Sequence, residues 1–167
     1  WYYYEVKKAV ILDGVTYIGR CAFLSQTQMN SVEIPESVTS IGASAFEECS
    51  SLINITIPES VTSIGHRAFD SCSSLTSIII PEGVTNIGDS AFYGCKSLGD
   101  IIIGSGITEI YEASFCETAF CNDESNWVTE DDVKVLYLNG YLLDMSWCSE
   151  FEIRNGTEVI AAGALDS

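Results

Sequence analysis

Hydrophobic positions recur along this chain with a fixed period of 23 residues. Phe23, Phe46, Phe69, Phe92 and Phe115 are equally spaced, and around them the chain follows the frame L-x-x-I-x-I-P-x-x-V-T-x-I-G-x-x-A-F-x-x-C. A short period of this kind is typical of a solenoid, in which each unit buries its apolar side only against its neighbours. Each apolar position of the frame is therefore predicted to form a continuous column through the core.

Within one repeat, the polar positions separate two extended segments. The spacing L-x-x-I-x-I, as in residues 52–57, predicts a short strand with its apolar side chains facing inward, and Pro58 ends it where no further N–H is needed. A second extended piece is expected at 61–64. Gly65 is then expected to turn the chain into a short helical or 3-10 stretch that carries Phe69 inward.

The regular frame fails after Phe115. Alternating apolar residues on either side of Asn139-Gly140 predict a hairpin there. We expect one solenoid domain over residues 1–167. Its expected parts are an N-terminal cap strand (1–8), regular repeats (9–118), an irregular insertion with the hairpin (119–150) and a partial final repeat (151–167).

The frame closely resembles the BspA-like leucine-rich repeats of surface proteins. This resemblance implies a right-handed leucine-rich-repeat solenoid, α/β or mostly β, with short parallel strands and short helical or 3-10 turns. It also implies a secreted or cell-surface location and a role in adhesion. The partners it implies are host extracellular-matrix proteins or other cell-surface proteins.

The charge of the chain narrows the class of partner. There are 24 acidic against 7 basic residues, a net charge of −17. Nucleic acid is excluded as a partner because its phosphates would be repelled. A run of 18 or more apolar residues is absent from the sequence, so no membrane span is predicted within this segment.

Three of the seven cysteines share one column, three residues after the stacked Phe. Equivalent side chains on neighbouring turns point in parallel, which is the wrong geometry for a disulfide. We therefore expect free, buried thiols that act as small hydrophobic side chains. Outside the column, a bridge of Cys121 with either Cys116 or Cys148 is left open. The column consists of Cys49, Cys72 and Cys95.

Catalytic and metal-binding groups are not evident. His66 is the single histidine and falls on a variable, outward position, so no triad or cysteine–histidine pair is predicted. The cysteines form no C-x-x-C pair for zinc, and the acidic stretch 122–132 lacks the ligand spacing of a calcium loop. We predict no enzyme activity, no cofactor and no metal, and leave open whether the acidic loop binds calcium.

Two surface features are candidate binding sites. The first is a strand-face patch, where the outward fifth position of L-x-x-I-x-I places isoleucine on two consecutive repeats. Strand propensity alone would also explain these residues. The second is an acidic row, one carboxylate per repeat at a shared position. The patch comprises Asn54, Thr56, Ser77, Ile79, Asp100 and Ile102, and the row comprises Asp13, Glu36, Glu59 and Glu82.

Three functional hypotheses follow. A non-catalytic protein-binding or adhesion module is favoured by the resemblance and by the lack of catalytic groups. A structural spacer would need no outward apolar residues. A glycan-binding module is the third, since exposed aromatic rings such as Trp127 or Trp147 could stack on sugars.

Overall fold

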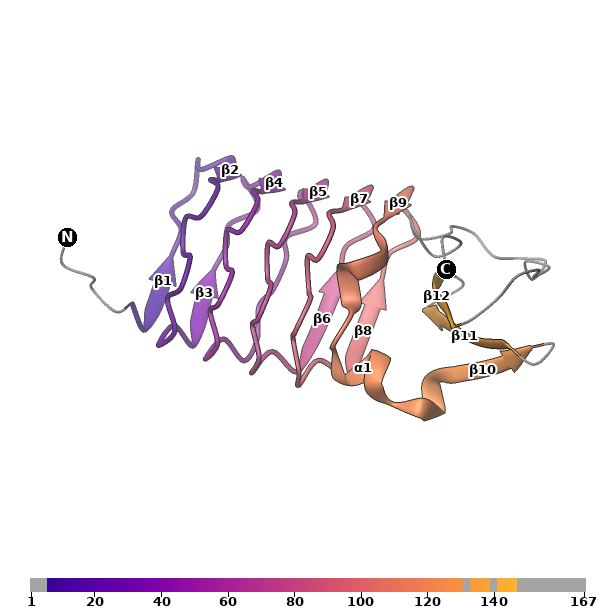
Figure 1. Cartoon of the computed structure of the whole chain (residues 1–167). Coiled ribbons are helices and arrows are strands. Elements are labelled where there is room, and N and C mark those ends of the chain that lie inside the picture. The colour runs from indigo at the N-terminus through magenta and orange to yellow at the C-terminus, as the bar shows by residue number, and fades with distance from the viewer. Residues whose placement is uncertain (1–5, 131–132, 139–140, 147–167) are drawn as a thin grey trace.

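The computed structural model describes residues 6–130, 133–138 and 141–146. These residues form a parallel β-solenoid with 23-residue turns, followed by a small antiparallel sheet at its C-terminal end (Figure 1). The predicted solenoid is therefore confirmed.

Two columns of short strands run along the solenoid. One is a single parallel sheet of five two-residue strands, one per turn. The other is made of two separate two-stranded parallel sheets, β1–β3 and β6–β8. The first column contains β2 (Tyr17–Ile18), β4 (Ser40–Ile41), β5 (Ser63–Ile64), β7 (Asn86–Ile87) and β9 (Glu109–Ile110). The second contains β1 (Lys8–Val10), β3 (Ser31–Glu33), β6 (Ser77–Ile80) and β8 (Asp100–Ile103).

The aromatic column is continuous through the core. Consecutive Phe rings from Phe23 to Phe115 lie 5.2 Å apart between centroids and within 6° of parallel. This distance is inside the range in which aromatic pairs attract each other beyond their area burial. The rings of Phe46, Phe69 and Phe92 are completely buried, whereas Phe23, on the first turn, is only half-buried.

The part of each repeat that follows the first strand column, such as residues 66–73, forms hydrogen-bonded turns in place of a strand. On the last turn this part contains one 3-10 helix, η1 (Glu112–Phe115). Backbone bonds within a turn alternate with bonds to the next turn. Phe69 N–H, for example, donates to Ala91 O at 2.7 Å, while Ala68 N–H donates to Gly65 O in its own turn at 3.1 Å. The backbone in this part is thus paired between turns as in a parallel sheet, although no strand forms.

Gly65 has a different role from the one the sequence suggested. Its φ is not in the left-handed region, so it is not required for a turn. A Cβ at this position would instead lie 2.6 Å from Ala43 N and 2.8 Å from the carbonyl carbon of Gly42. The frame needs glycine here because the backbones of two consecutive turns approach too closely for a side chain.

The cysteine column is buried as predicted, and each thiol is also hydrogen-bonded. Cys49, Cys72 and Cys95 are completely buried. Each Sγ donates to the carbonyl of a stacked Phe on the preceding turn at 3.1 Å, as Cys72 does to Phe46 O. Burial raises the pKa of Cys49 and Cys95 to about 12, and also raises the pKa of Cys72.

These thiols should be unreactive in the folded protein. The thiolate is the nucleophile, and a pKa near 12 leaves almost none of it at pH 8. Brief alkylation with iodoacetamide and peptide mass spectrometry should find Cys21, which is exposed, modified in the native protein. Cys49, Cys72 and Cys95 should be modified only after unfolding. Modification of any of the three in native protein, or a disulfide among them, would contradict the buried column.

After η1 the chain leaves the repeat frame, and it is more regular there than the sequence indicated. It forms helix α1 (Ala119–Asn122), the 3-10 helix η2 (Glu124–Asn126) and strand β10 (Trp127–Glu130). The side chain of Thr118 caps α1 by accepting from Cys121 N, and Asp123 caps η2 by accepting from Ser125 N. Capping by a short polar side chain satisfies a backbone N–H that has no partner in the helix.

Strand β10 continues into an antiparallel sheet in the order β10–β11–β12. Strands β11 (Val133–Leu138) and β12 (Tyr141–Ser146) flank residues 139–140 and pair with Leu138 opposite Tyr141. The expected final repeat (151–167) and most of the expected cap strand (1–8) lie outside the described residues, as does Cys148. The Cys121 bridge therefore stays a prediction.

Candidate functional site

The strand-face patch is centred on two neighbouring isoleucines that point away from the core. In β6 and β8 alternate side chains face opposite sides, so Ile78 and Ile80 are buried while Ile79 is 61% exposed. Ile102 occupies the same position in β8 and is 57% exposed. The two are directly paired in the parallel register. The structure thus brings together the isoleucines that the period of 23 placed side by side.

A hollow lies beside this pair, where the strand column is interrupted. Residues 52–58 form no strand: β3 pairs only with β1, and β6 pairs only with β8. Asn54 occupies the position at which Ser77 begins β6 and Asp100 begins β8 on the next two turns. The hollow has a volume of about 350 Å³ and is bordered by Asn54, Thr56, Ser77 and Ile79. Four of the six patch residues therefore line one depression, and Asp100 adjoins it, paired with Ser77.

The acidic row meets the patch at one residue. Asp13, Glu36, Glu59 and Glu82 are all exposed, on successive turns, and Glu59 also lines the hollow. Glu82 is already engaged, since it accepts from the hydroxyl of Ser105 at 2.7 Å and from its N–H at 2.8 Å. These bonds hold the pKa of Glu82 below its usual value.

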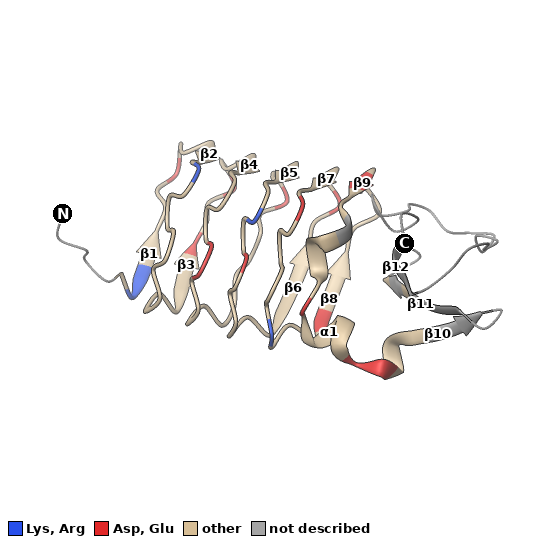
Figure 2. Ribbon diagram, in the orientation of Figure 1, with Lys and Arg blue, Asp and Glu red and all other residues tan. Residues whose placement is uncertain are grey.

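Charge is unevenly spread along the strand face (Figure 2). At the N-terminal end, Lys8 of β1 forms an ion pair with Glu33 of β3. At the other end, Asp100 of β8 is exposed and takes part in no ion pair with the rest of the described chain. A partner that approaches Ile79 and Ile102 therefore meets carboxylates that carry no basic counterpart.

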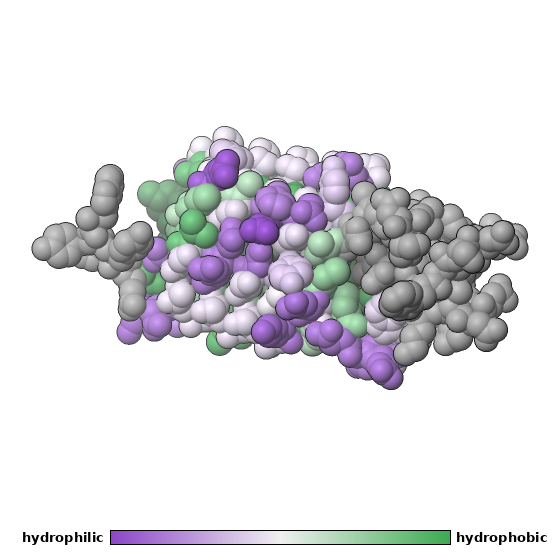
Figure 3. Space-filling view, in the orientation of Figure 1, coloured by the Kyte–Doolittle hydropathy of each residue, from purple (hydrophilic) through white to green (hydrophobic). Residues whose placement is uncertain are grey.

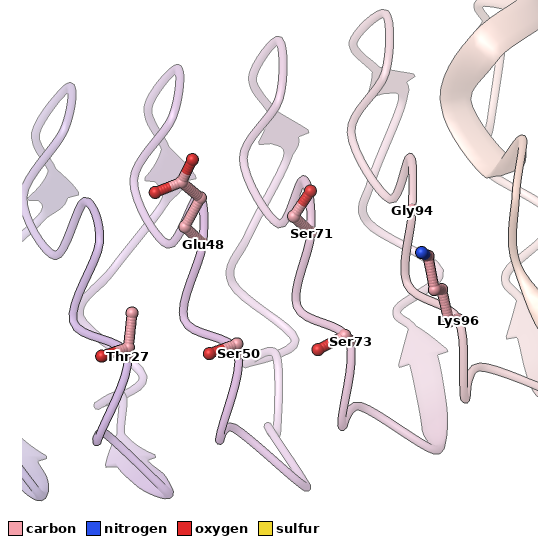
Figure 4. Close-up of a pocket in the computed structure, with 7 residues that line it drawn as sticks. All are labelled: Thr27, Glu48, Ser50, Ser71, Ser73, Gly94 and Lys96. Carbon is pink, nitrogen blue, oxygen red and sulfur yellow. The ribbon is translucent and has the colours of Figure 1, made fainter.

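A second depression, on the turn side, was not anticipated from the sequence. It has a volume of about 450 Å³ and crosses four turns. In Figure 4 the hydroxyl groups of Thr27, Ser50 and Ser73 point the same way from equivalent positions, with Glu48 and Lys96 on different turns. Glu48 has φ 61°, in the left-handed region. The polar residues at these two positions of the repeat, those of Glu48 and Ser50, can be read from the sequence. The alignment of their side chains in one depression depends on the left-handed backbone conformation.

The groups considered for catalysis and metal binding lie apart from these depressions. His66 is half-exposed, with Nδ1 3.3 Å from Asp89 Oδ2. In the described part of the chain, no three His, Cys, Asp or Glu side chains come together in a way that could hold a metal ion. Asp123, in the acidic loop, uses a carboxylate oxygen to cap η2. No described helix has the length and apolar character needed to span a bilayer.

Trp127 bears on the glycan hypothesis. Its ring is half-buried, and its indole N–H donates to Cys121 O at 2.8 Å. The ring therefore serves to fix the segment after α1. Trp147, the other tryptophan considered, lies outside the described residues.

Solved structures of bacterial leucine-rich repeat proteins resemble this chain. A leucine-rich repeat protein from Bacteroides ovatus is 34% identical over 66% of this chain and 30% of its own length, with a TM-score of 0.60. The leucine-rich repeat protein of T. pallidum is 32% identical over 67% of this chain and 55% of its own, with a TM-score of 0.64. A leucine-rich cell surface protein from Faecalibacterium prausnitzii is 25% identical over 95% of this chain and 52% of its own, with a TM-score of 0.50.

The chain thus spans between about a third and about a half of the first two of these proteins. No curated protein matches it. The pattern of the BspA type leucine-rich repeat region matches residues 1–122 in six copies, which is most of the chain. With the stacked Phe column and the 23-residue parallel turns, this match shows that the chain belongs to the BspA-type leucine-rich repeat family.

Proposed function

We propose that this chain is a non-catalytic protein-binding module of a secreted or cell-surface protein, and that the strand-face patch contacts the partner. The observation that carries the proposal is the exposed pair Ile79 and Ile102 beside the hollow. Two adjacent outward isoleucines supply apolar area that a spacer has no need to expose.

The patch is suited to binding because its geometry is set before a partner arrives. Ile79 and Ile102 stand on paired strands whose other faces are anchored in the core by Ile78 and Ile101. Only side-chain rotamers need to be ordered on binding, so the entropic cost is small. The hollow next to Ile79 offers a recess into which an apolar side chain of the partner fits, with Asn54, Thr56 and Ser77 as a polar rim.

Charge favours a basic or mixed protein surface as the partner. The carboxylates of the acidic row, together with Asp100, would attract lysine and arginine side chains, most strongly at low salt. Membership of a leucine-rich repeat family supports a protein-interaction module, and one similar structure is described as a leucine-rich cell surface protein. We extend this to adhesion, with host extracellular-matrix proteins or other cell-surface proteins as the partner class.

The proposal is tested by measuring binding of the chain to immobilised matrix proteins. Ile79→Ser/Ile102→Ser should weaken binding by at least about tenfold, because truncating two central apolar contacts typically costs 1.4 kcal/mol or more. Leu12→Ser is the matched control: Leu12 is 72% exposed but lies on the first turn, remote from β6 and β8. It should bind as the wild type does.

The charge component is measured in the same assay. Glu36→Gln/Glu59→Gln should reduce the salt dependence of binding; Glu82 is left intact because it is bonded to Ser105.

Equal binding by a folded Ile79→Ser/Ile102→Ser variant would move the site elsewhere on the molecule. Absence of binding by the wild type to any protein of the panel would favour the spacer.

A further inference from the structure

The backbone of residues 54–57, which line the hollow, is not paired with the neighbouring turns. Within the part of the chain that the structure describes, none of their N–H or C=O groups takes part in a hydrogen bond, whereas the equivalent residues of β6 and β8 pair in register. The solenoid itself is continuous here, because Phe69 stacks on Phe46 and on Phe92 at the same distance of 5.2 Å. The hollow is therefore lined by backbone groups that can bond a ligand.

Glu59, at the rim of the hollow, is a carboxylate without a donor. It is exposed and forms no ion pair or side-chain hydrogen bond with the rest of the described chain. One turn further on, Glu82 accepts two hydrogen bonds from Ser105, which stands one period after it. One period after Glu59 the chain has Glu82 itself, a second carboxylate, in place of a donor. Glu59 therefore keeps its full capacity for a cationic partner.

The wall next to Glu59 is apolar. Ile79 and Pro81 line the hollow from the next turn, and Ile53, directly before the unpaired segment, is 49% exposed. This is not a general property of the surface, since the middle turns of the face seen in Figure 3 carry mainly hydrophilic residues. An occupant of the hollow thus meets apolar side chains and hydrogen-bond acceptors in one recess.

We propose that the hollow takes an arginine side chain of the protein partner. This inference rests on the proposed function and names the group of the partner that enters the site. A guanidinium carries five N–H donors in a planar fork, which matches the Glu59 carboxylate together with carbonyls of the unpaired segment. Its aliphatic stem is the apolar part of the contact and packs against Ile79.

Charge and donor geometry favour arginine over other polar side chains. Among the described residues that line the hollow none is basic, so the cation comes from the partner. A lysine ammonium is a compact charge with three donors, and it has no planar fork to bond a carboxylate through two parallel hydrogen bonds. An acidic side chain is repelled by Glu59 and by Asp100, which adjoins the hollow.

The proposal is tested with small molecules, so that the result does not depend on which protein binds. Butylguanidinium, butylammonium and 1-butanol have the same stem, and each is titrated into the whole chain while amide chemical shifts are followed by NMR. Butylguanidinium should shift the amides of residues 54–57 and Ile79 saturably. Butylammonium should bind at least about fivefold more weakly, because it lacks the bidentate contact, and butanol should give no saturable shift.

Three results of this titration would overturn the proposal. The first is the absence of a saturable shift with butylguanidinium, and the second is a shift confined to residues away from the hollow. The third is equal binding of butylguanidinium and butylammonium, which would show attraction of any cation to an acidic protein.

Glu59→Gln removes the charge from the hollow and keeps the size of the side chain. It should weaken butylguanidinium binding at least about tenfold, because a hydrogen bond between two charged groups is lost. Glu124→Gln is the matched control: it removes the same charge from an exposed residue of η2 that does not line the hollow. It should bind as the wild type does, and equal weakening by both variants would contradict the proposal.

Amide hydrogen exchange tests the unpaired backbone independently. The N–H groups of residues 54–57 should exchange at least about tenfold faster than those of Thr62 and Gly65, which donate to carbonyls of the preceding turn at 2.9 Å. Equal protection would show that the segment is paired within the chain. The carbonyls that the guanidinium needs would then be occupied, and the proposal would fall.

The arginine site and the proposed function can fail separately. Butylguanidinium bound in the hollow, with no binding of any matrix protein, would support the arginine site and refute the partner class. Matrix-protein binding that Ile79→Ser/Ile102→Ser weakens, with no butylguanidinium in the hollow, would support the patch and overturn arginine as its occupant.

Discussion

Replacing Phe69 by Ala should lower the free energy of unfolding by about 3–5 kcal/mol, the usual cost of truncating a fully buried aromatic ring. Phe69 is completely buried and stacks on Phe46 and Phe92, at 5.2 Å on each side. Its removal would leave a cavity between two rings that the neighbouring turns hold in place. Urea unfolding followed by circular dichroism measures the change.

Phe23→Ala is the matched control for this prediction. The side chain removed is the same and the position in the frame is the same, but Phe23 is half-buried and stacks on one ring only. This substitution should lower the free energy of unfolding by about 1–2 kcal/mol. A half-buried ring contributes less buried apolar area than a fully buried one, and its removal leaves no enclosed cavity. Equal losses at Phe23 and Phe69 would mean that the column does not stabilise the fold by stacking between turns.

The second large loss of stability is expected at Gly65, where the backbones of two consecutive turns approach each other closely. Gly65→Ala should destabilise the protein by about 3 kcal/mol, the upper range for overpacking. The new Cβ would lie 2.6 Å from Ala43 N and 2.8 Å from the Gly42 carbonyl carbon, and neither backbone atom can move without disturbing β4 and β5. Unfolding in urea is again the measurement.

Gly19→Ala separates this steric effect from any intrinsic effect of alanine. The substitution is identical and occupies the same frame position, yet a Cβ at Gly19 has open space around it. The change should remain within about 0.5 kcal/mol, as for surface substitutions in general. A comparable loss at both glycines would show that backbone flexibility, and not the distance between turns, explains the glycine of the repeat.

Part of the candidate site could be derived from the period alone. Alternation along L-x-x-I-x-I places Ile79 and Ile102 outward, and a spacing of 23 places them on consecutive turns, as the β6–β8 register confirms. The hollow beside them could not be derived. It depends on the loss of pairing over residues 52–58, although this repeat matches the frame as well as its neighbours do.

The sequence by itself determined the features that depend on one turn and its period: the solenoid, the inward columns, and the buried cysteines. In a repeat structure a side chain's environment is nearly the same on every inner turn, so periodicity is sufficient to assign it. Only the tertiary structure decided the features that depend on the distance between turns. These include the contact that requires Gly65, the bond from Cys72 to Phe46 O, the hydroxyl depression and the α1–β10 segment beyond the frame. The Gly65 and Cys72 contacts are made to backbone atoms, which are common to all residues, and a sequence pattern carries no record of how closely such atoms approach.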